Sequence, residues 1–64
     1  MPVINGKPEH AAGLTLGEYL RTAGYNVKQV VVERNLIIVP RDQLENVRIE
    51  AEDTIEILNF VGGG

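Results

Sequence analysis

The sequence ends in three consecutive glycines, and the main-chain carboxylate of Gly64 is the group best suited to do chemistry. Glycines lack side chains, so a tail such as Val61-Gly62-Gly63-Gly64 can thread a narrow channel and adopt backbone angles closed to other residues. Fully extended, four residues reach roughly 13 Å at about 3.3 Å each. We therefore expect residues 61–64 to form a flexible tail that carries the Gly64 carboxylate into a partner's active site.

The Gly64 carboxylate is ionised at neutral pH. A partner that screens the charges would let it attack the α-phosphate of ATP and become an acyl-adenylate. The unhindered glycyl carbonyl would then accept a nucleophile, and a sulfur nucleophile would leave a terminal thiocarboxylate. Glycines at a terminus more commonly form a frayed end without function. Here, however, they directly follow a segment that strongly predicts a strand, with no linker between, which favours a functional tail.

The side chains give little support for catalysis. His10 is the only histidine, and the sequence has no cysteine or serine for it to activate. The carboxylates form no metal-binding or paired acid and base pattern, and the glycines match neither a phosphate loop nor a dinucleotide fingerprint. Without serine there is no phosphopantetheine site, and Lys7 is a weak match to a biotin or lipoyl lysine. We expect a carrier with no bound cofactor or metal, and not an enzyme.

Composition limits the remaining possibilities. A chain of 64 residues, 44% of them hydrophobic, can form one domain with a small aliphatic core. The net charge of −3 and scattered basic residues argue against a nucleic-acid partner. No apolar run is long enough to span a membrane, and the lack of cysteine favours the cytoplasm. Five acids are expected to give the C-terminal half a negative surface: Glu45, Glu50, Glu52, Asp53 and Glu56.

The first half of the chain predicts a hairpin and a helix. Asn5-Gly6 after Val3-Ile4 is typical of a type I′ turn, although Pro8 weakens the second strand, residues 7–11, and favours a sheet edge. Thr15 and Glu18 match a capping box, so a helix should begin there. The residues predicted to face the core are Leu16, Tyr19, Leu20 and Ala23, and Gly24 should close the helix in the left-handed conformation.

The second half predicts mostly strands. These are a central strand over residues 27–33, a turn at Asn35, a strand over residues 36–39, a helical turn over residues 40–44 and a brief strand over residues 47–49. In the last strand, residues 54–61, Ile55 and Ile57 should face the core, which puts Glu56, Leu58 and Phe60 on the other face. Leu58, Phe60, Val61 and Gly62 are then candidates for partner binding, unless that face is covered or the tail folds back.

Together these elements predict an α+β protein of the β-grasp type, with one main helix across a mixed sheet of four or five strands. Residues 1–60 would form the domain, and residues 61–64 the flexible glycine tail. The sequence resembles the ThiS family, the sulfur carrier proteins of thiamin thiazole biosynthesis. The segments that carry the resemblance are residues 3–7, 31–35, 38–41, 53–57 and 60–64, which read VINGK, VVERN, IVPR, DTIEI and FVGGG.

The resemblance implies a ubiquitin-like β-grasp fold and a set of partners. A ThiF-like adenylating enzyme would use ATP to activate Gly64, a sulfur donor system would supply the sulfur, and thiazole synthase would consume the thiocarboxylate. Gly63 and Gly64 match the functional dipeptide, and Gly62 and Phe60 match positions near partner contacts. Two alternatives stay open: the sulfur carrier subunit of molybdopterin synthase, and a β-grasp protein-binding module that carries nothing.

Overall fold

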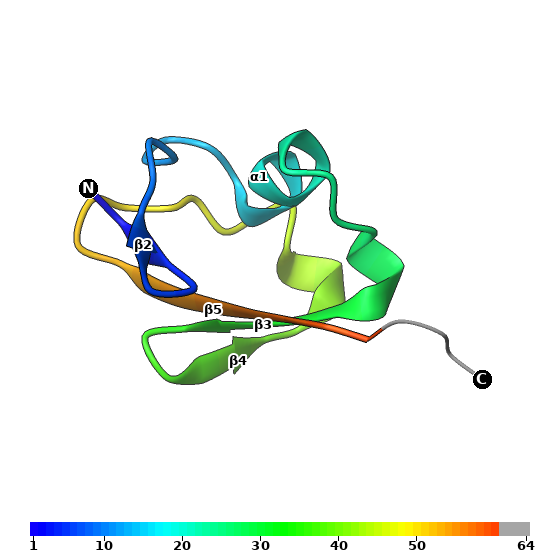
Figure 1. The fold of residues 1–64 in the computed structure, drawn as a ribbon. Helices are drawn as coiled ribbons and strands as arrows, with labels where there is room; N and C mark the ends of the chain where they lie inside the picture. The colour runs from blue at the N-terminus through cyan, green and yellow to red at the C-terminus, as the bar shows by residue number, and fades with distance from the viewer. Residues whose placement is uncertain (61–64) are drawn as a thin grey trace.

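A computed structural model describes residues 1–60, and residues 61–64 lie outside the described range. Five strands form one mixed sheet in the order β2-β1-β5-β3-β4, and the helix α1 packs across one face of it (Figure 1). The elements are β1 Val3–Ile4, β2 Lys7–Pro8, α1 Leu16–Thr22, β3 Val30–Arg34, β4 Ile37–Val39 and β5 Thr54–Asn59, with short 3₁₀ helices η1 Val27–Gln29 and η2 Arg41–Gln43. This is the ubiquitin-like β-grasp fold that the sequence predicts.

Asn5 and Gly6 form the predicted turn between β1 and β2. Both residues have positive φ angles, 50° and 82°, as a type I′ hairpin turn requires. The strand β2 lies at the sheet edge, as expected, but contains only Lys7 and Pro8 instead of residues 7–11. The last ladder bond is donated by the Glu9 amide to the Pro2 carbonyl at 2.9 Å, and Pro2 has no N–H to return a bond to Glu9, so the pairing ends there.

The turn between β3 and β4 uses the same geometry with a less suitable residue. Asn35 and Leu36 have φ angles of 53° and 70°, and Arg34 pairs with Ile37 across the turn. The predicted turn at Asn35 is therefore confirmed, but Leu36 belongs to the turn and not to the strand. A leucine at positive φ is uncommon because its Cβ crowds the backbone.

The helix α1 begins as the sequence predicts. Thr15 Oγ1 accepts a hydrogen bond from the Glu18 amide at 3.1 Å, and Glu18 Oε1 accepts one from the Thr15 amide at 2.8 Å, which completes the capping box. This main-chain hydrogen bond from Thr15 is the largest effect that lowers the pKa of Glu18 below its ordinary value. Gly24 has a φ angle of 90° and ends the helix in the predicted left-handed conformation.

The helix packs on the sheet through Leu16 and Leu20, which are fully buried, while Tyr19 is half-buried. The prediction that Ala23 faces the core is wrong, because the helix ends at Thr22 and Ala23 is an exposed cap residue. The core also contains aliphatic residues from all parts of the chain: Ile4, Ala11, Val30, Val32, Leu44, Ile49, Ile55 and Ile57.

Three element boundaries differ from the prediction. Residues 27–29 form η1 instead of the start of a strand, because the Asn26 side chain accepts a hydrogen bond from the Lys28 amide and favours a helical turn. The helical turn after Pro40 begins one residue later than predicted, at Arg41. Residues 47–49 form no strand, and Arg48 makes a single bridge to Thr15 instead.

Candidate functional site

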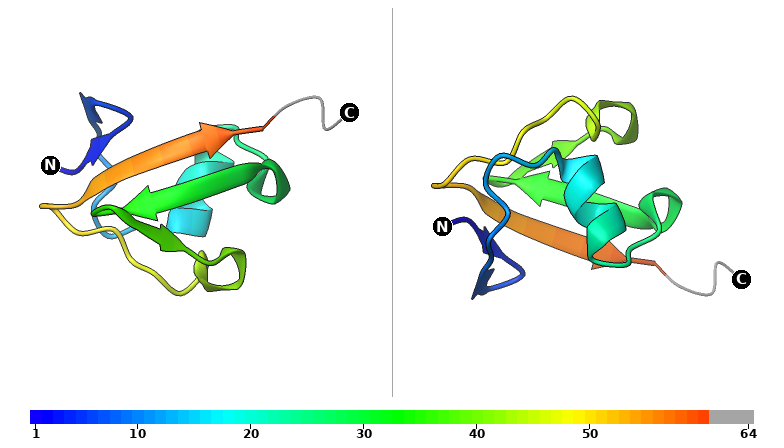
Figure 2. Two further views of the ribbon diagram at one scale, coloured as in Figure 1. Left: turned by 90° about the horizontal axis from the view of Figure 1, so that it is seen from below. Right: turned by 90° about the horizontal axis from the view of Figure 1, so that it is seen from above.

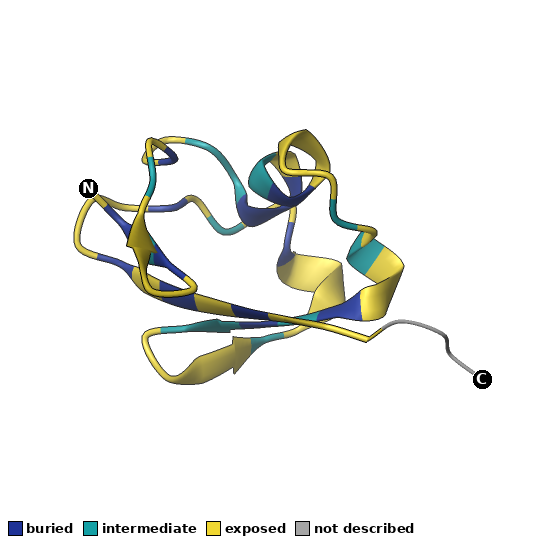
Figure 3. Ribbon diagram, viewed as in Figure 1, coloured by how far each residue is buried: buried dark blue, intermediate teal, exposed yellow. Residues whose placement is uncertain are grey.

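The candidate site is the C-terminal end of β5, the strand that leads to the glycine tail. This strand lies in the middle of the sheet, parallel to β1 on one side and antiparallel to β3 on the other. From Thr54 to Leu58, successive residues of β5 alternate between exposed and buried (Figure 3). Ile55 and Ile57 are buried and Glu56 and Leu58 are exposed, which confirms the predicted orientation.

Asn5 holds the middle of β5 after β1 has ended. Its Oδ1 accepts a hydrogen bond from the Ile57 amide at 2.7 Å, and its Nδ2 donates to the Ile57 carbonyl at 3.3 Å. The Asn5 amide also donates to the carbonyl of Ile55 at 2.9 Å. The side chain of Asn5 therefore makes the hydrogen bonds to β5 that one more residue of β1 would have made.

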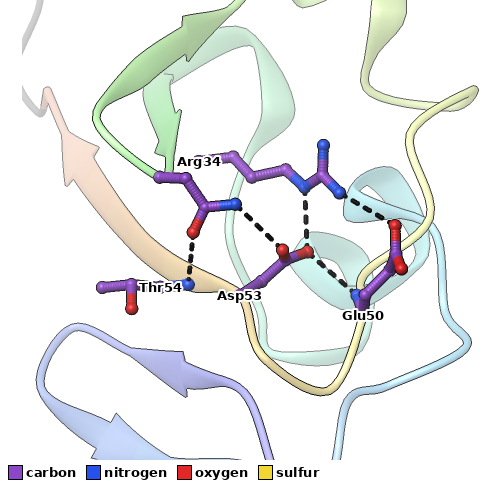
Figure 4. A network of polar contacts seen from close by, with 5 residues as sticks. Arg34, Glu50, Asp53 and Thr54 are labelled. Carbon is purple, nitrogen blue, oxygen red and sulfur yellow. Dashed lines mark hydrogen bonds and ion pairs between the residues drawn. The ribbon is translucent and has the colours of Figure 1, made fainter.

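Asp53 holds the start of β5 through a polar network (Figure 4). Its carboxylate accepts hydrogen bonds from Arg34 Nε at 2.8 Å, from the Glu50 amide at 2.9 Å and from Asn35 Nδ2 at 3.0 Å. Asn35 Oδ1 in turn accepts from the Thr54 amide at 2.9 Å. Burial alone would raise the pKa of Asp53, but these hydrogen bonds, led by that from Arg34, hold its pKa below the ordinary value of 3.8.

The far end of β5 presents two apolar side chains to solvent. Leu58 is 51% exposed and Phe60 is 59% exposed. The main chain here is still attached to the body, because the Phe60 amide donates a hydrogen bond to the Gln29 carbonyl at 2.7 Å. Two of the four predicted partner-binding residues are thus accessible, at the point where the chain leaves the sheet (Figure 1).

The other predicted site residues are outside the described range. These are the partner-binding candidates Val61 and Gly62 and the reactive candidates Gly63 and Gly64. Their roles stay predictions.

Ion pairs reduce the predicted negative surface of the C-terminal half but leave Glu52 and Glu56 exposed. Glu45 forms an ion pair with Arg21 at 2.6 Å, and Glu50 and Asp53 both pair with Arg34, at 3.3 and 2.8 Å. These pairs could not be predicted from spacing along the sequence, because the arginines lie in α1 and β3, far from the acidic residues in the chain. Asp53 is also buried, so it contributes nothing to the surface.

The described residues offer few other places for chemistry. Residues 1–60 contain no group of three or more side chains able to hold a metal ion. A surface hollow of about 320 Å³ lies beside the N-terminus, and Met1, Pro2 and His10 contribute to its lining. That end of the molecule is opposite to the end of β5 (Figure 1). Within the same residues, no helix has the length and apolar character needed to cross a bilayer.

Sequence reasoning missed the two asparagines that position β5. Asn5 and Asn35 were recognised as turn residues only, whereas each also makes side-chain hydrogen bonds to β5 or its first residues. The available signal was the residue type, since asparagine both tolerates positive φ and carries a donor and an acceptor. The partner strand could not be read from sequence, because Ile57 is 52 residues from Asn5.

Comparison with known proteins gives consistent matches. A thiazole synthase of Magnetococcus marinus is 40% identical over 62 residues, which are 95% of this chain but 19% of that protein. The chain thus spans about a fifth of the length of the thiazole synthases it matches. The sulfur carrier protein ThiS of Bacillus subtilis is 38% identical over 50 residues, which cover 78% of this chain and 76% of that protein.

The structural comparison agrees with the sequence matches. The crystal structure of the thiamine biosynthesis protein ThiS from Geobacter metallireducens superposes with a TM-score of 0.78 at 30% identity, covering 98% of this chain and 97% of that one. The ThiS family model matches residues 3–64, so the match includes the sheet, the helix and the three terminal glycines. The chain therefore belongs to the ThiS family.

Proposed function

We propose that this protein is a sulfur carrier in thiamin biosynthesis and that its reactive group is the C-terminal carboxylate of Gly64. The match of the ThiS family model to residues 3–64 carries this proposal, because it covers the glycine tail as well as the folded body. The relative from Bacillus subtilis, which is itself named a sulfur carrier, supports it. In this proposal, residues 1–60 are the body and residues 61–64 are the flexible tail.

The proposed cycle has three steps. A carboxylate oxygen of Gly64 attacks the α-phosphorus of ATP in a ThiF-like adenylating enzyme, and pyrophosphate leaves. The terminal sulfur of a donor persulfide then attacks the acyl-adenylate carbonyl, and AMP leaves. A second thiol attacks the donor sulfur of the resulting acyl disulfide, so that a disulfide forms on the donor side and the thiocarboxylate is released. Thiazole synthase finally takes the sulfur. ATP is a substrate of the partner in this scheme, and the chain itself holds no cofactor.

The anchoring of β5 supports a carrier role. Asn5 and Asp53 hold the strand along its length, and the Phe60 amide is bonded to Gln29. A tail of four residues would therefore leave the body from a fixed point, and an enzyme that binds the body would receive the tail in one direction. Preorganisation of this kind lowers the entropic cost of bringing two reacting groups together.

Thiazole synthase is the partner that the comparisons favour. Thiazole synthases of Magnetococcus marinus and Paramagnetospirillum magneticum each contain a segment 40% identical to nearly the whole of this chain. A carrier-like segment within the same polypeptide as a synthase supports a working relationship between the two. We therefore propose thiazole synthase, and not molybdopterin synthase, as the acceptor.

The test is the intact mass of the protein after incubation with the adenylating enzyme, ATP and a sulfur source. We expect a species in which one oxygen is replaced by sulfur, and we expect its loss when thiazole synthase and its other substrates are added. A chain shortened by Gly64 should unfold at the same temperature as the full chain but give no sulfur-containing species.

Two results would contradict the proposal. If no sulfur is incorporated and the shortened chain works as well as the full one in thiazole formation, the protein is a binding module. If the thiocarboxylate forms but only molybdopterin synthase consumes it, the chain serves the other pathway.

A further inference from the structure

The sheet has one face that no helix covers. Seen from below, β5, β3 and β4 lie in front of α1 (Figure 2, left), and seen from above α1 lies in front of the sheet (Figure 2, right). We call the side away from α1 the outer face. Because Val32, Ile55 and Ile57 are buried on the α1 side, the residues that alternate with them stand on the outer face.

Two glutamates lie side by side near the middle of the outer face. Glu33 of β3 and Glu56 of β5 are direct cross-strand partners. Two positions further along, the Asn35 amide donates a hydrogen bond to the Thr54 carbonyl at 2.8 Å. Hydrogen-bonded pairs recur at every second position of an antiparallel ladder, so Glu33 and Glu56 also form such a pair, with their Cα atoms about 5.5 Å apart.

Aliphatic side chains flank the two glutamates. Val31 and Leu58 are the next outer-face pair along β3 and β5, and Ile38 of β4 pairs with Glu33 on its other side. Leu58 is 51% exposed and Ile38 is 61% exposed. We call these five residues, Val31, Glu33, Ile38, Glu56 and Leu58, the outer-face patch.

The glutamate pair is unfavourable in the isolated protein. Like charges directly opposite each other on adjacent strands destabilise a sheet. Three other acidic residues, described above, pair with arginines, whereas neither Glu33 nor Glu56 forms an ion pair within residues 1–60. Local choices that oppose folding are expected mainly where they serve function.

We propose that the outer-face patch docks on a protein surface that presents an arginine between Glu33 and Glu56, surrounded by apolar side chains that contact Leu58 and Ile38. The guanidinium group suits this position because its several donors can bond two carboxylates at once. The inference rests on the proposed function, since we take the partner to be thiazole synthase. Beyond the proposed function, it predicts that the partner's binding surface carries a positive charge opposite Glu33 and Glu56.

Charge disfavours a second copy of this chain as the occupant. Two outer-face patches in contact would bring four carboxylates together between proteins that each carry a net charge of −3. Like charges across an interface act against association. A surface that covers the apolar residues of the patch must therefore also carry a positive charge for the two glutamates.

The test compares affinity for thiazole synthase with the stability of the free protein. Glu33→Gln and Glu56→Gln should each raise the dissociation constant at least about tenfold, because each leaves the partner's arginine short of a carboxylate. Each should also raise the thermal midpoint of the free protein by about 2–4 °C, because the repulsion is removed. Glu56→Lys should stabilise the free protein further, through a Glu33–lysine pair, and weaken binding most.

The matched control is Glu52→Gln, which removes an exposed carboxylate outside the patch. It should change neither affinity nor thermal midpoint. If both patch variants bind like the control while the natural chain binds and becomes thiocarboxylated, this inference is wrong and the proposed function stands. If the natural chain neither binds thiazole synthase nor takes up sulfur, both are wrong. Self-association that the patch variants abolish would assign the surface to a second copy and overturn the inference.

Discussion

The side chain of Asn5 bonds both the amide and the carbonyl of Ile57, 52 residues away in the sequence. These two bonds continue the parallel ladder from β1 to β5 beyond the point where β1 turns back. They fix the half of β5 that leads to Leu58 and Phe60. The first turn of the chain thus controls the position of its last strand.

Asn5→Gly should therefore destabilise the protein without disturbing the turn. Glycine accepts the φ angle of 50°, but the substitution leaves the Ile57 amide without an acceptor. An unsatisfied buried donor costs about 1–3 kcal/mol, and chemical denaturation would measure it. Gly6→Asn is the control for strain in the turn: it places a side chain at a φ angle of 82° but leaves the Asn5–Ile57 hydrogen bonds in place, so it separates the two effects. An Asn5→Gly protein as stable as the natural one would show that water replaces the side chain.

Asp53 should make stability depend on pH in the acid range. Its pKa in the folded protein lies below the ordinary value of 3.8, so its contribution is complete well above that pH. The contribution is lost as the pH falls through the folded pKa. Asp53→Asn should lower the free energy of unfolding at pH 7 by about 2 kcal/mol, and the difference from the natural protein should shrink toward pH 2.

Thermal unfolding from pH 2 to pH 7 would measure this effect, with Glu52→Gln as the control. Glu52 is exposed and adjacent in sequence, so its substitution should alter stability by less than about 0.5 kcal/mol. A constant difference between Asp53→Asn and the natural protein at all pH values would show that the Asp53 charge contributes nothing.

Gly17→Ala should be nearly neutral by itself because two effects oppose each other. Alanine favours the helix by up to about 1 kcal/mol. Its Cβ, however, would meet the Glu45 carboxylate that pairs with Arg21. This ion pair is about half exposed, so losing it costs about 0–1 kcal/mol.

A double-mutant cycle separates the two effects at Gly17. In a Glu45→Ala background nothing opposes the added methyl group, and Gly17→Ala should stabilise the protein by up to about 1 kcal/mol. Denaturation of the four variants gives the coupling. A loss of more than about 2 kcal/mol in both backgrounds would instead place a rigid backbone contact at Gly17.

Phe60→Asp should weaken binding to the adenylating enzyme while leaving the domain folded. Phe60 is 59% exposed beside the proposed tail, so its substitution should change stability by about 0.5 kcal/mol or less. Burial of an aromatic residue at an interface commonly contributes enough that its loss weakens binding tenfold or more. Leu36→Asp is the matched control, because Leu36 is 88% exposed at the β3–β4 turn. Loss of the folded circular dichroism spectrum in Phe60→Asp would show that Phe60 belongs to the core.

Sequence reasoning worked where short-range chemistry decides the structure. The Asn5-Gly6 turn, the capping box of Thr15 and Glu18, and the alternation in β5 were all predicted, since each depends on residues within a few positions of one another. Residues 27–29 were misassigned because β-branched residues suggested a strand, whereas the Asn26 cap favours η1. At these residues, a local hydrogen bond outweighs the intrinsic strand propensity.

By itself, the sequence determined the β-grasp pattern, the exposed face of β5 and the glycine tail as the candidate reactive group. The tertiary structure decided which charges meet: Arg34 pairs with both Asp53 and Glu50, while Glu33 and Glu56 stand together and form no ion pair within residues 1–60. Strand order and register set these neighbours. They follow from packing the whole aliphatic core, and no spacing along the chain encodes them.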